Sequence, residues 1–180
     1  METVALFGGS FDPPHIGHEA IVKALLDFKE IQKVVIMPTF LNPFKSKSYA
    51  PSELRFKWLK KIFHSYESVE VDSFEIQQTK KVPTIESVKY LLKKYDRVYL
   101  VIGADNLGSL HSWYKYDELA QLVTFIVAKR NNIKIPKNFL HLNVDVNISS
   151  TELRKNLDNS KLPQQCAQEI MKFYKETNAK

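Results

Sequence analysis

Residues 6–18 read LFGGSFDPPHIGH, and this stretch decides how the rest of the chain is interpreted. An apolar run that starts at Val4 ends at two glycines, and two prolines separate these from His15 and His18, where we expect the first turn of a helix. A strand, a glycine turn and a helix start direct unpaired backbone N–H groups at one place, as phosphate-binding sites do. The stretch therefore predicts a phosphate site to which two histidines, three apart on one helical face, add hydrogen-bond donors.

The bulk composition indicates a globular protein. The chain has 180 residues, of which 44% are hydrophobic and 26% charged, and it contains no repeat, low-complexity segment or linker. We therefore predict a single domain over residues 1–180. The net charge of +6 is compatible with nucleic-acid binding, with small anionic substrates or with a solvated surface rich in lysine, and it does not choose among them.

The cysteine count and the hydropathy suggest a compartment. Cys166 is the only cysteine, which rules out an intrachain disulfide and a zinc site of the cysteine type. The N-terminus does not resemble a signal peptide, and no apolar run reaches membrane-spanning length. We expect a soluble cytoplasmic protein that binds no membrane.

Strand and helix patterns alternate along the chain, which is typical of an α/β fold. Helical patterns begin near residues 18, 52, 84 and 163. We predict a doubly wound, Rossmann-like α/β fold whose sheet is mostly parallel, with five or six strands and helices on both faces. Strand-like runs occur at residues 4–7, 33–38, 69–72 with a possible extension to 76, 97–102, 123–128 and 139–146.

The helix that follows residue 51 is predicted to have one apolar and one basic side. Ser52 is a suitable N-cap, and Leu54, Trp58 and Ile62 form the apolar side. The opposite side is interpreted as a solvated face that carries Arg55, Lys57, Lys60 and Lys61.

Two further segments lie where a ligand is expected in such a fold. The loop at residues 39–51 follows a predicted strand, and its Lys45 and Lys47 are either phosphate contacts or plain solvated charges. Residues 148–154 read ISSTELR, in which hydroxyl residues cap a helix start and Arg154 lies one turn inside. Because a helix start directs backbone N–H groups at one place, as in residues 6–18, we predict a second anion-binding site here.

The residues alone leave several readings of the opening stretch open. It contains neither the G-x-G-x-x-G dinucleotide fingerprint nor a Walker loop. His15 and His18 are also candidates for zinc ligation, with Asp12 as the one nearby third ligand, or for simple helix capping. The remaining histidines stand singly and are assigned to structure.

Taken together, the two motifs resemble a known family. Residues 8–18 and 148–154 are similar to the His-x-Gly-His and Ile-Ser-Ser-Thr-x-x-Arg motifs of the bacterial nicotinate mononucleotide adenylyltransferases, members of the nucleotidyltransferase superfamily. Intermediate pieces match in the right order along nearly the whole chain, at residues 43–45, 84, 102–107 and 112–114. The resemblance implies transfer of AMP from ATP to nicotinate mononucleotide, which yields nicotinate adenine dinucleotide and pyrophosphate in NAD biosynthesis.

The resemblance also implies roles for individual residues. His15, His18, Lys45 and Arg154 would be catalytic, as donors or positive charges at the phosphates. The ATP site would comprise Gly8, Gly9, Ser10, Phe11, Ile102, Gly103, Asp105, Ser150 and Thr151, and the mononucleotide site would comprise Asn42, Thr84, Asp105, Trp113 and Tyr114.

Magnesium is the cofactor that the resemblance implies, bound mainly through the ATP phosphates, and no residue is assigned as its ligand. No nucleic acid is expected as a partner, and the sequence does not distinguish a monomer from a homodimer. The phenylalanine in Pro43-Phe44-Lys45 and the Val82-Pro83 before Thr84 depart from the family pattern, so the preference for the acid over the amide mononucleotide stays open.

Two rival functions belong to different classes. One is a related transferase, such as a cytidylyltransferase or a phosphopantetheine adenylyltransferase, although the latter has threonine where this chain has His15 and lacks an ending like Arg154. The other is a non-catalytic nucleotide-binding or RNA-binding module, although no RNA-binding signature is present.

Overall fold

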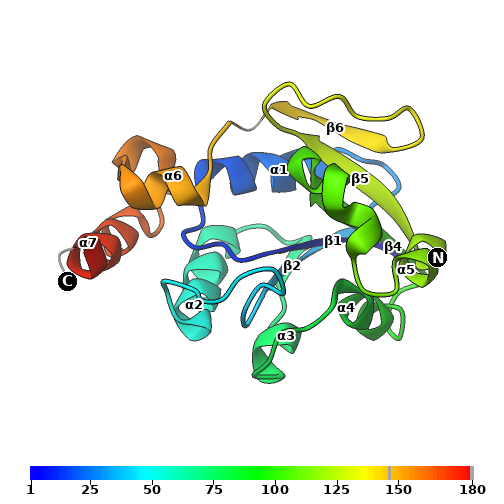
Figure 1. Cartoon of the computed structure of the whole chain (residues 1–180), viewed down its shortest axis with the longest axis horizontal. Helices are drawn as coiled ribbons and strands as arrows, with labels where there is room; N and C mark the ends of the chain where they lie inside the picture. Colours follow the sequence, from blue (N-terminus) through cyan, green and yellow to red (C-terminus); the bar gives the residue numbers. More distant parts are fainter. Residues whose placement is uncertain (146, 179–180) are drawn as a thin grey trace.

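The computed structural model describes residues 1–145 and 147–178. Its centre is a six-stranded sheet in the order β3-β2-β1-β4-β5-β6, in which every strand pair is parallel. The predicted doubly wound α/β fold is confirmed, and the sheet is wholly rather than mostly parallel (Figure 1). The strands are β1 (Thr3–Gly9), β2 (Lys33–Pro38), β3 (Val69–Val71), β4 (Arg97–Gly103), β5 (Val123–Lys129) and β6 (Leu140–Asp145).

Helices cover both faces of this sheet. In the strand order, the chain reverses its direction of winding between β1 and β4, which is where open α/β sheets bind ligands, beyond the carboxyl ends of the strands. The α-helices are α1 (Ile16–Leu26), α2 (Ser52–Phe63), α3 (Phe74–Gln77), α4 (Thr84–Leu91), α5 (Tyr116–Leu122), α6 (Ser150–Lys155) and α7 (Ala167–Asn178), and the 3₁₀ helices are η1 (Ala104–Ser112) and η2 (Asn159–Lys161).

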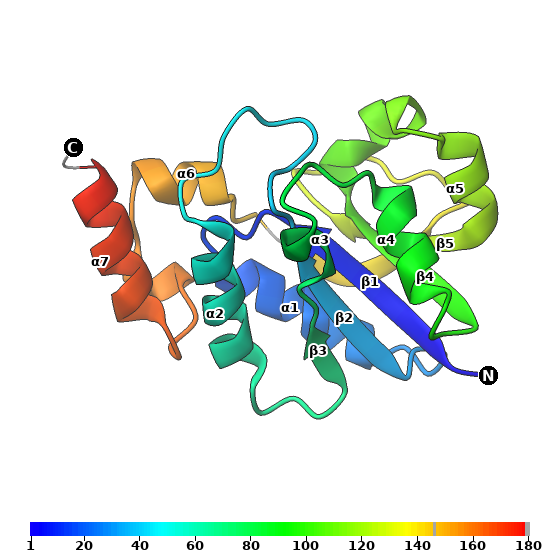
Figure 2. The same cartoon turned by 90° about the horizontal axis from the view of Figure 1, so that it is seen from below.

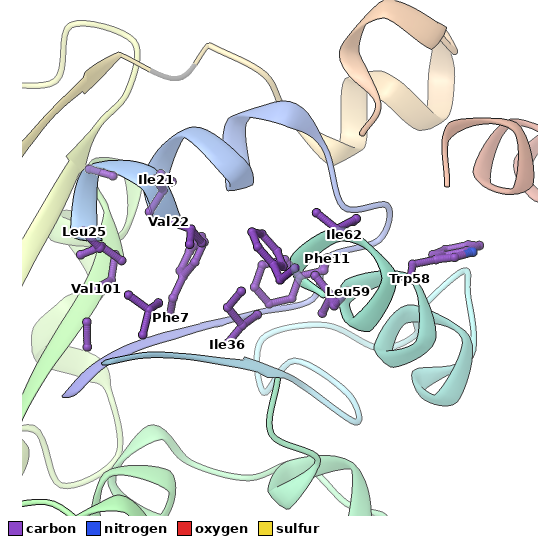
Figure 3. Packing of buried hydrophobic residues seen from close by; sticks show 14 of the residues in the cluster. Phe7, Phe11, Ile21, Val22, Leu25, Ile36, Trp58, Leu59, Ile62 and Val101 are labelled. Carbon is purple, nitrogen blue, oxygen red and sulfur yellow. The ribbon is translucent and has the colours of Figure 1, made fainter. Parts of the chain in front are cut away.

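The alternation of side chains along β1 divides the core into two layers. Ala5 and Phe7 point to the layer that contains α1, α2, α6 and α7, whereas Val4 and Leu6 point to the layer that contains α4, α5 and η1. Figure 3 shows the first layer, where Phe7 lies under α1 and Phe11 is packed against α2. Because both faces are buried there, the four central strands β1, β2, β4 and β5 are almost continuously apolar, whereas the edge strands β3 and β6 are not.

Helix α1 begins two residues before the predicted start, at Ile16. The preceding residue, His15, is its N-cap in an extended conformation, and the His15 side chain accepts a hydrogen bond from the Gly17 amide. Histidine takes the place that serine, threonine or aspartate usually occupies at this position.

Two predictions about the segment after β2 are wrong. Ser52 is the first residue of α2 rather than its cap, and Pro51 is the N-cap without a side-chain hydrogen bond. Arg55 is fully buried instead of solvated, whereas the three lysines of the same predicted face are exposed. Arg55 lies at the i position of an i, i+3, i+4, i+7 stripe with Trp58, Leu59 and Ile62, so the helical period turns it inward.

The remaining differences concern the ends of elements. The possible strand over residues 73–76 is a helical turn, α3, because the Asp72 carboxylate accepts a hydrogen bond from the Phe74 amide and turns the chain there. The last helix, α7, begins at Ala167 rather than Pro163. Val146, the end of the predicted strand 139–146, lies outside the described residues. None of the described helices is long and apolar enough to cross a membrane.

Candidate active site

The glycine pair lies inside β1 rather than in a turn after it. Gly8 and Gly9 are paired with Met37 and Pro38 of β2, and no described glycine has a positive φ. The turn follows at residues 10–15, where Phe11 has φ of 50° and the Asp12–Pro13 peptide bond is cis. A β-carbon at Gly8 would meet only the Met37 carbonyl oxygen, at 3.7 Å. Glycine therefore leaves space beside the strand rather than relieving a clash within the fold.

The two histidines of the opening stretch are stacked at the start of α1. Their ring centroids are 3.7 Å apart. The Gly17 amide donates to Nδ1 of His15 at 3.1 Å, and the His15 amide donates to Nδ1 of His18 at 3.0 Å. Because each Nδ1 accepts a hydrogen bond, a neutral ring carries its proton on Nε2. The helix start therefore holds two imidazoles in one tautomer, with Nε2–H free to donate.

Burial keeps both of these rings neutral. It lowers the pKa of His15 to about 3, with a further contribution from the positive charge of Arg130. It also lowers the pKa of His18 well below the ordinary value, and His15 and Arg130 add to the shift. At neutral pH the pair therefore consists of two uncharged hydrogen-bond donors rather than one base and one acid.

The zinc reading of His15, His18 and Asp12 has no support in this geometry. Both Nδ1 atoms are held by backbone amides, and the Asp12 carboxylate accepts the amides of Tyr49 and Ala50 at 2.7 and 3.0 Å. The interpretation of these histidines as helix caps is confirmed, since both rings accept backbone amides at the start of α1. Their role as donors to a phosphate stays a prediction, which this orientation of the rings favours.

Two cavities meet beside the histidines. A first cavity, of about 200 Å³, is bordered by Asn42, Thr84, Ile102 and Trp113, and a second, of about 160 Å³, is bordered by both histidines, Asp105 and Arg130. Together they extend across the carboxyl ends of the strands on both sides of the reversal in winding. The residues that border both cavities are Phe7, Gly8, Gly103 and Asn106.

The first cavity contains polar groups without a protein partner. Two buried atoms, Thr39 Oγ1 and Trp113 Nε1, form no hydrogen bond with the described residues. Both residues border this cavity. Glu75 is also buried at its wall, where burial raises the pKa of its carboxyl to about 7 against the opposing hydrogen bond from the Ser87 hydroxyl. Unpaired polar groups in an aromatic-lined cavity suit a ligand that supplies the missing partners.

The second motif is attached to the turn at residues 10–15. The Ser150 hydroxyl donates to the Pro13 carbonyl at 2.8 Å, and Arg154 donates to the Asp12 carbonyl at 2.5 Å and to Thr151 Oγ1 at 3.3 Å. Ser149 caps α6 as predicted, with its hydroxyl accepting the Glu152 amide. The two motifs, far apart in sequence, therefore form one continuous surface.

Lys45 also reaches this turn, near Arg154. Its Nζ lies 3.5 Å from Ser10 Oγ, and burial together with the neighbouring Arg154 lowers its pKa. Two predicted residues lie elsewhere: the Phe11 ring is buried against Phe7 and His18, and Tyr114 is 60% exposed and borders neither cavity.

Sequence reasoning missed Arg130, which borders the second cavity. Its guanidinium is paired with Asp105 at 3.3 Å and donates to the Ile148 carbonyl at 3.5 Å. Its place directly after β5, at the same sheet edge as the other site residues, is a signal that the sequence contains. Glu75 was also missed, and no pattern around it distinguishes it from a surface glutamate.

Comparison with known proteins agrees with this geometry. Residues 6–156 match the cytidylyltransferase-like family model. The whole chain is 61% identical to a probable nicotinate-nucleotide adenylyltransferase of Sulfurimonas denitrificans, over 99% of that protein. A probable nicotinate-nucleotide adenylyltransferase of Campylobacter fetus is 48% identical over 98% of this chain and 99% of its own.

Solved structures share the fold at lower identity. The nicotinic acid mononucleotide adenylyltransferase of Plasmodium falciparum complexed with NaAD superimposes with a TM-score of 0.79 at 20% identity, over 97% of this chain and 98% of that one. At that identity the likeness shows the fold alone, whereas the two curated relatives are similar over their full length. The chain therefore belongs to the nicotinate-nucleotide adenylyltransferases, within the cytidylyltransferase-like family.

Proposed function

We propose that this chain transfers AMP from ATP to nicotinate mononucleotide, giving nicotinate adenine dinucleotide and pyrophosphate in NAD biosynthesis. The observation that carries the proposal is the pair of neutral rings, His15 and His18, fixed by backbone amides beside the junction of two cavities. Such an arrangement suits a reaction that joins two ligands at a phosphorus atom. The names of the curated relatives support this choice of reaction.

We assign ATP to the second cavity and the mononucleotide to the first, although Gly9 and Ile102, which the resemblance places in the ATP site, border only the first. Asp105, at the wall of the second cavity, would accept ribose hydroxyl groups. Trp113, at the wall of the first, would stack on the pyridine ring, since flat aromatic rings bind each other over their faces. Main-chain groups at Thr84, at the wall of the first cavity, would receive the nicotinate carboxylate, so this end of the cavity would distinguish the acid from the amide.

The proposed reaction needs no general base. A phosphate oxygen of the mononucleotide attacks the α-phosphorus of ATP, the bond from that phosphorus to the bridging oxygen breaks, and pyrophosphate leaves with the electron pair. An ionised phosphate is already a nucleophile, so the protein contributes position and charge stabilisation. The Nε2–H groups of His15 and His18 would donate to the oxygens on which negative charge increases.

Lys45 and Arg154, which are neighbours at the turn formed by residues 10–15, would neutralise the phosphate charges. Lys45 Nζ is near Ser10 Oγ, and the Arg154 guanidinium is held by the Asp12 carbonyl and stacked 4.4 Å from the Tyr49 ring. Both cations are therefore oriented before a ligand arrives, which lowers the cost of binding a polyphosphate.

Magnesium would be held chiefly by the ATP phosphates, where it would neutralise negative charge. The carboxylates nearest the histidines fit this arrangement, since Asp12 is engaged by two amides and Asp105 by Arg130. We expect excess EDTA to abolish pyrophosphate release and added magnesium to restore it. Full activity in the presence of EDTA would contradict a role for the ion.

A pyrophosphate-release assay with the purified chain tests the proposal. We expect release when ATP and nicotinate mononucleotide are both present and none when either is absent. Replacing nicotinate mononucleotide with phosphopantetheine, or ATP with CTP, examines the related transferases, and a non-catalytic module would release nothing under any condition. Comparing kcat/KM for the acid and amide mononucleotides then measures the expected preference for the acid.

We further propose that the reaction takes place in the cytoplasm, where ATP is available. The free thiol of Cys166 is consistent with a reducing compartment.

A further inference from the structure

Arg55 is the most deeply buried cation of the described chain, and the mechanism above does not use it. None of its surface is exposed. In the described part of the chain, all four hydrogen bonds of its guanidinium go to backbone carbonyls rather than to a carboxylate. An apolar side chain would anchor α2 in the core without burying a charge, so packing alone does not account for an arginine here.

The four carbonyls belong to three separate points of the chain. Nη2 donates to Thr39 and Phe40 at 2.7 and 3.1 Å, at the start of the segment between β2 and α2, residues 39–51, which we call the Lys45 loop. Nε donates to Ala50 at 3.0 Å, at the end of the same loop. Nη1 donates to Ser10 at 2.6 Å, in the turn that leads to the histidines. One planar group therefore joins both ends of the loop to that turn.

Asp12 strengthens the attachment at the end of the loop. Its carboxylate accepts the amides of Tyr49 and Ala50 and a hydrogen bond from the Tyr174 hydroxyl of α7. Asp12 and Arg55 are both buried, and Asp12 is the acidic group whose charge acts most on the guanidinium. The loop end is thus held by two buried groups of opposite charge, the Asp12 carboxylate within the turn and the Arg55 guanidinium that contacts it through Ser10.

The middle of the Lys45 loop, in contrast, has few attachments. Residues 43–47 are exposed, and the loop forms an arch between the end of β2 and the start of α2 in Figure 2. Its side-chain contacts to the rest of the molecule include the 3.5 Å approach of Lys45 Nζ to Ser10 Oγ and the 3.4 Å contact of Lys81 Nζ with the Pro43 carbonyl. The position of Lys45 therefore depends on how the two ends of the arch are held.

We propose that Arg55 is a positioning residue that fixes both ends of the Lys45 loop to the turn at residues 10–15, so that Lys45 reaches the transferring phosphate. The inference rests on the proposed function, in which Lys45 contacts phosphate. Only arginine offers five N–H donors in a fixed plane, so it can join three chain points at once. Lysine at this position keeps the charge and loses that geometry.

A double-mutant cycle tests the proposal. In the wild-type background we expect Lys45→Ala to lower kcat/KM for ATP about 100-fold, the usual size of a lost transition-state contact. In the Arg55→Lys background, where Lys45 is already misplaced, Lys45→Ala should lower kcat/KM for ATP by less than about fivefold. Asp105→Asn is the matched control, since Asp105 lies outside the loop: its cost should be the same in both backgrounds.

Three outcomes overturn the proposal. If Lys45→Ala lowers kcat/KM by the same factor in both backgrounds, Arg55 is merely structural. If Lys45→Ala leaves kcat/KM unchanged in the wild-type background, Lys45 has no function that Arg55 could support. Equal coupling to Asp105→Asn would show a diffuse loss of structure instead. If Arg55→Lys does not fold, Asp12→Asn replaces it, because it loosens only one end of the loop. A coupling between Asp12→Asn and Lys45→Ala that has the same sign and is smaller then supports the proposal. The absence of coupling between these two substitutions overturns it.

Amide hydrogen exchange separates this inference from the proposed function. We expect Arg55→Lys to accelerate exchange of peptides covering residues 40–48 at least about tenfold, with β4 unchanged. Unchanged exchange in the loop would overturn the inference even in an active enzyme. If the wild type releases no pyrophosphate, the proposed function fails, while the exchange result still decides whether Arg55 fixes the loop.

Discussion

At the scale of single residues, His15 links helix capping to the proposed chemistry. The hydrogen bond that caps α1 also determines the tautomer of the ring, and burial keeps the ring neutral. A cap made by serine or aspartate would satisfy the same amide but would place no ring donor at the cavity. This explains why a residue type that is uncommon at helix starts occurs here.

The depressed pKa of His15 makes stability depend on pH. Since the folded pKa is about 3 and the unfolded value 6.5, the unfolded chain binds a proton below pH 6.5 that the folded chain does not, so stability falls on acidification. Lowering the pH from 7.5 to 5 therefore reduces the free energy of unfolding by about 2 kcal/mol through His15. Asparagine caps a helix without titrating.

We therefore expect acidification from pH 7.5 to 5 to lower the free energy of unfolding of His15→Asn by about 2 kcal/mol less than that of the wild type. Urea unfolding at pH 7.5 and 5 measures the difference. The exposed His64 provides the control substitution, His64→Asn, which should leave the pH dependence as it is. An identical loss in His15→Asn and the wild type would contradict the burial of a neutral ring.

His18→Ala removes the second ring donor. We expect kcat to fall by about 100-fold or more, because the lost hydrogen bond strengthens as charge develops on the transferring group. Steady-state turnover with both substrates saturating measures this, and circular dichroism verifies the fold. His141→Ala, at an exposed position of β6, is the control. A folded His18→Ala variant with unchanged kcat would refute the assigned role.

Trp113→Ala should separate the two substrates. The indole borders the first cavity and not the second, so its loss should weaken mononucleotide binding about tenfold or more while ATP binding changes little. Titration calorimetry with each ligand alone gives both affinities. Equal losses for the two ligands would argue against stacking on the pyridine ring.

At the scale of elements, the junction of β4 and η1 combines a close approach of Gly103 to Asp105 with the contact to ATP that we propose for Asp105. A β-carbon at Gly103 would lie 2.5 Å from Asp105 Oδ1, so alanine there has to displace the Asp105 side chain from its pairing with Arg130. Gly108, in the same 3₁₀ helix, has open space around its α-carbon.

We expect Gly103→Ala to raise KM for ATP about tenfold, while Gly108→Ala, the matched control, changes it less than about twofold. Initial rates at varied ATP concentration provide the measurement. If both substitutions behave alike, the Asp105 carboxylate has no part in nucleotide binding.

At the scale of the whole molecule, the net charge of +6 is best explained by small anionic substrates. Lys45, Arg130 and Arg154 gather around the turn and the second cavity, so the positive potential is focused where polyphosphate would bind. We expect kcat/KM for ATP to fall several-fold between about 20 and 200 mM salt with kcat nearly constant, because screening weakens the approach of charged ligands. Stopped-time assays across a salt series measure this, and a salt-independent kcat/KM would contradict it.

Much of the architecture could be read from local sequence patterns. β-branched apolar runs are buried on both faces of a parallel sheet, so β2 matches its predicted range and β1, β4 and β5 differ by one or two residues at an end. The candidate site could be located because Gly8 lies near the end of β1, His15 caps α1 and Ser150 begins α6, and such strand ends and helix starts meet at one edge of the sheet. The wrong prediction at residues 73–76 also has a local cause, since one hydrogen bond from the Phe74 amide to the Asp72 carboxylate decides between strand and turn.

The sequence by itself determined the parallel α/β fold, the sheet edge at which the site forms and the residue types available for phosphate chemistry, since hydrophobic period and motif spacing are local properties. Only the tertiary structure decided the neutral state of His15 and the inward turn of Arg55. The pKa of a histidine and the partners of a buried arginine depend on distant segments that fold against them. Desolvation and hydrogen bonding arise from three-dimensional neighbours, which the order of residues does not specify.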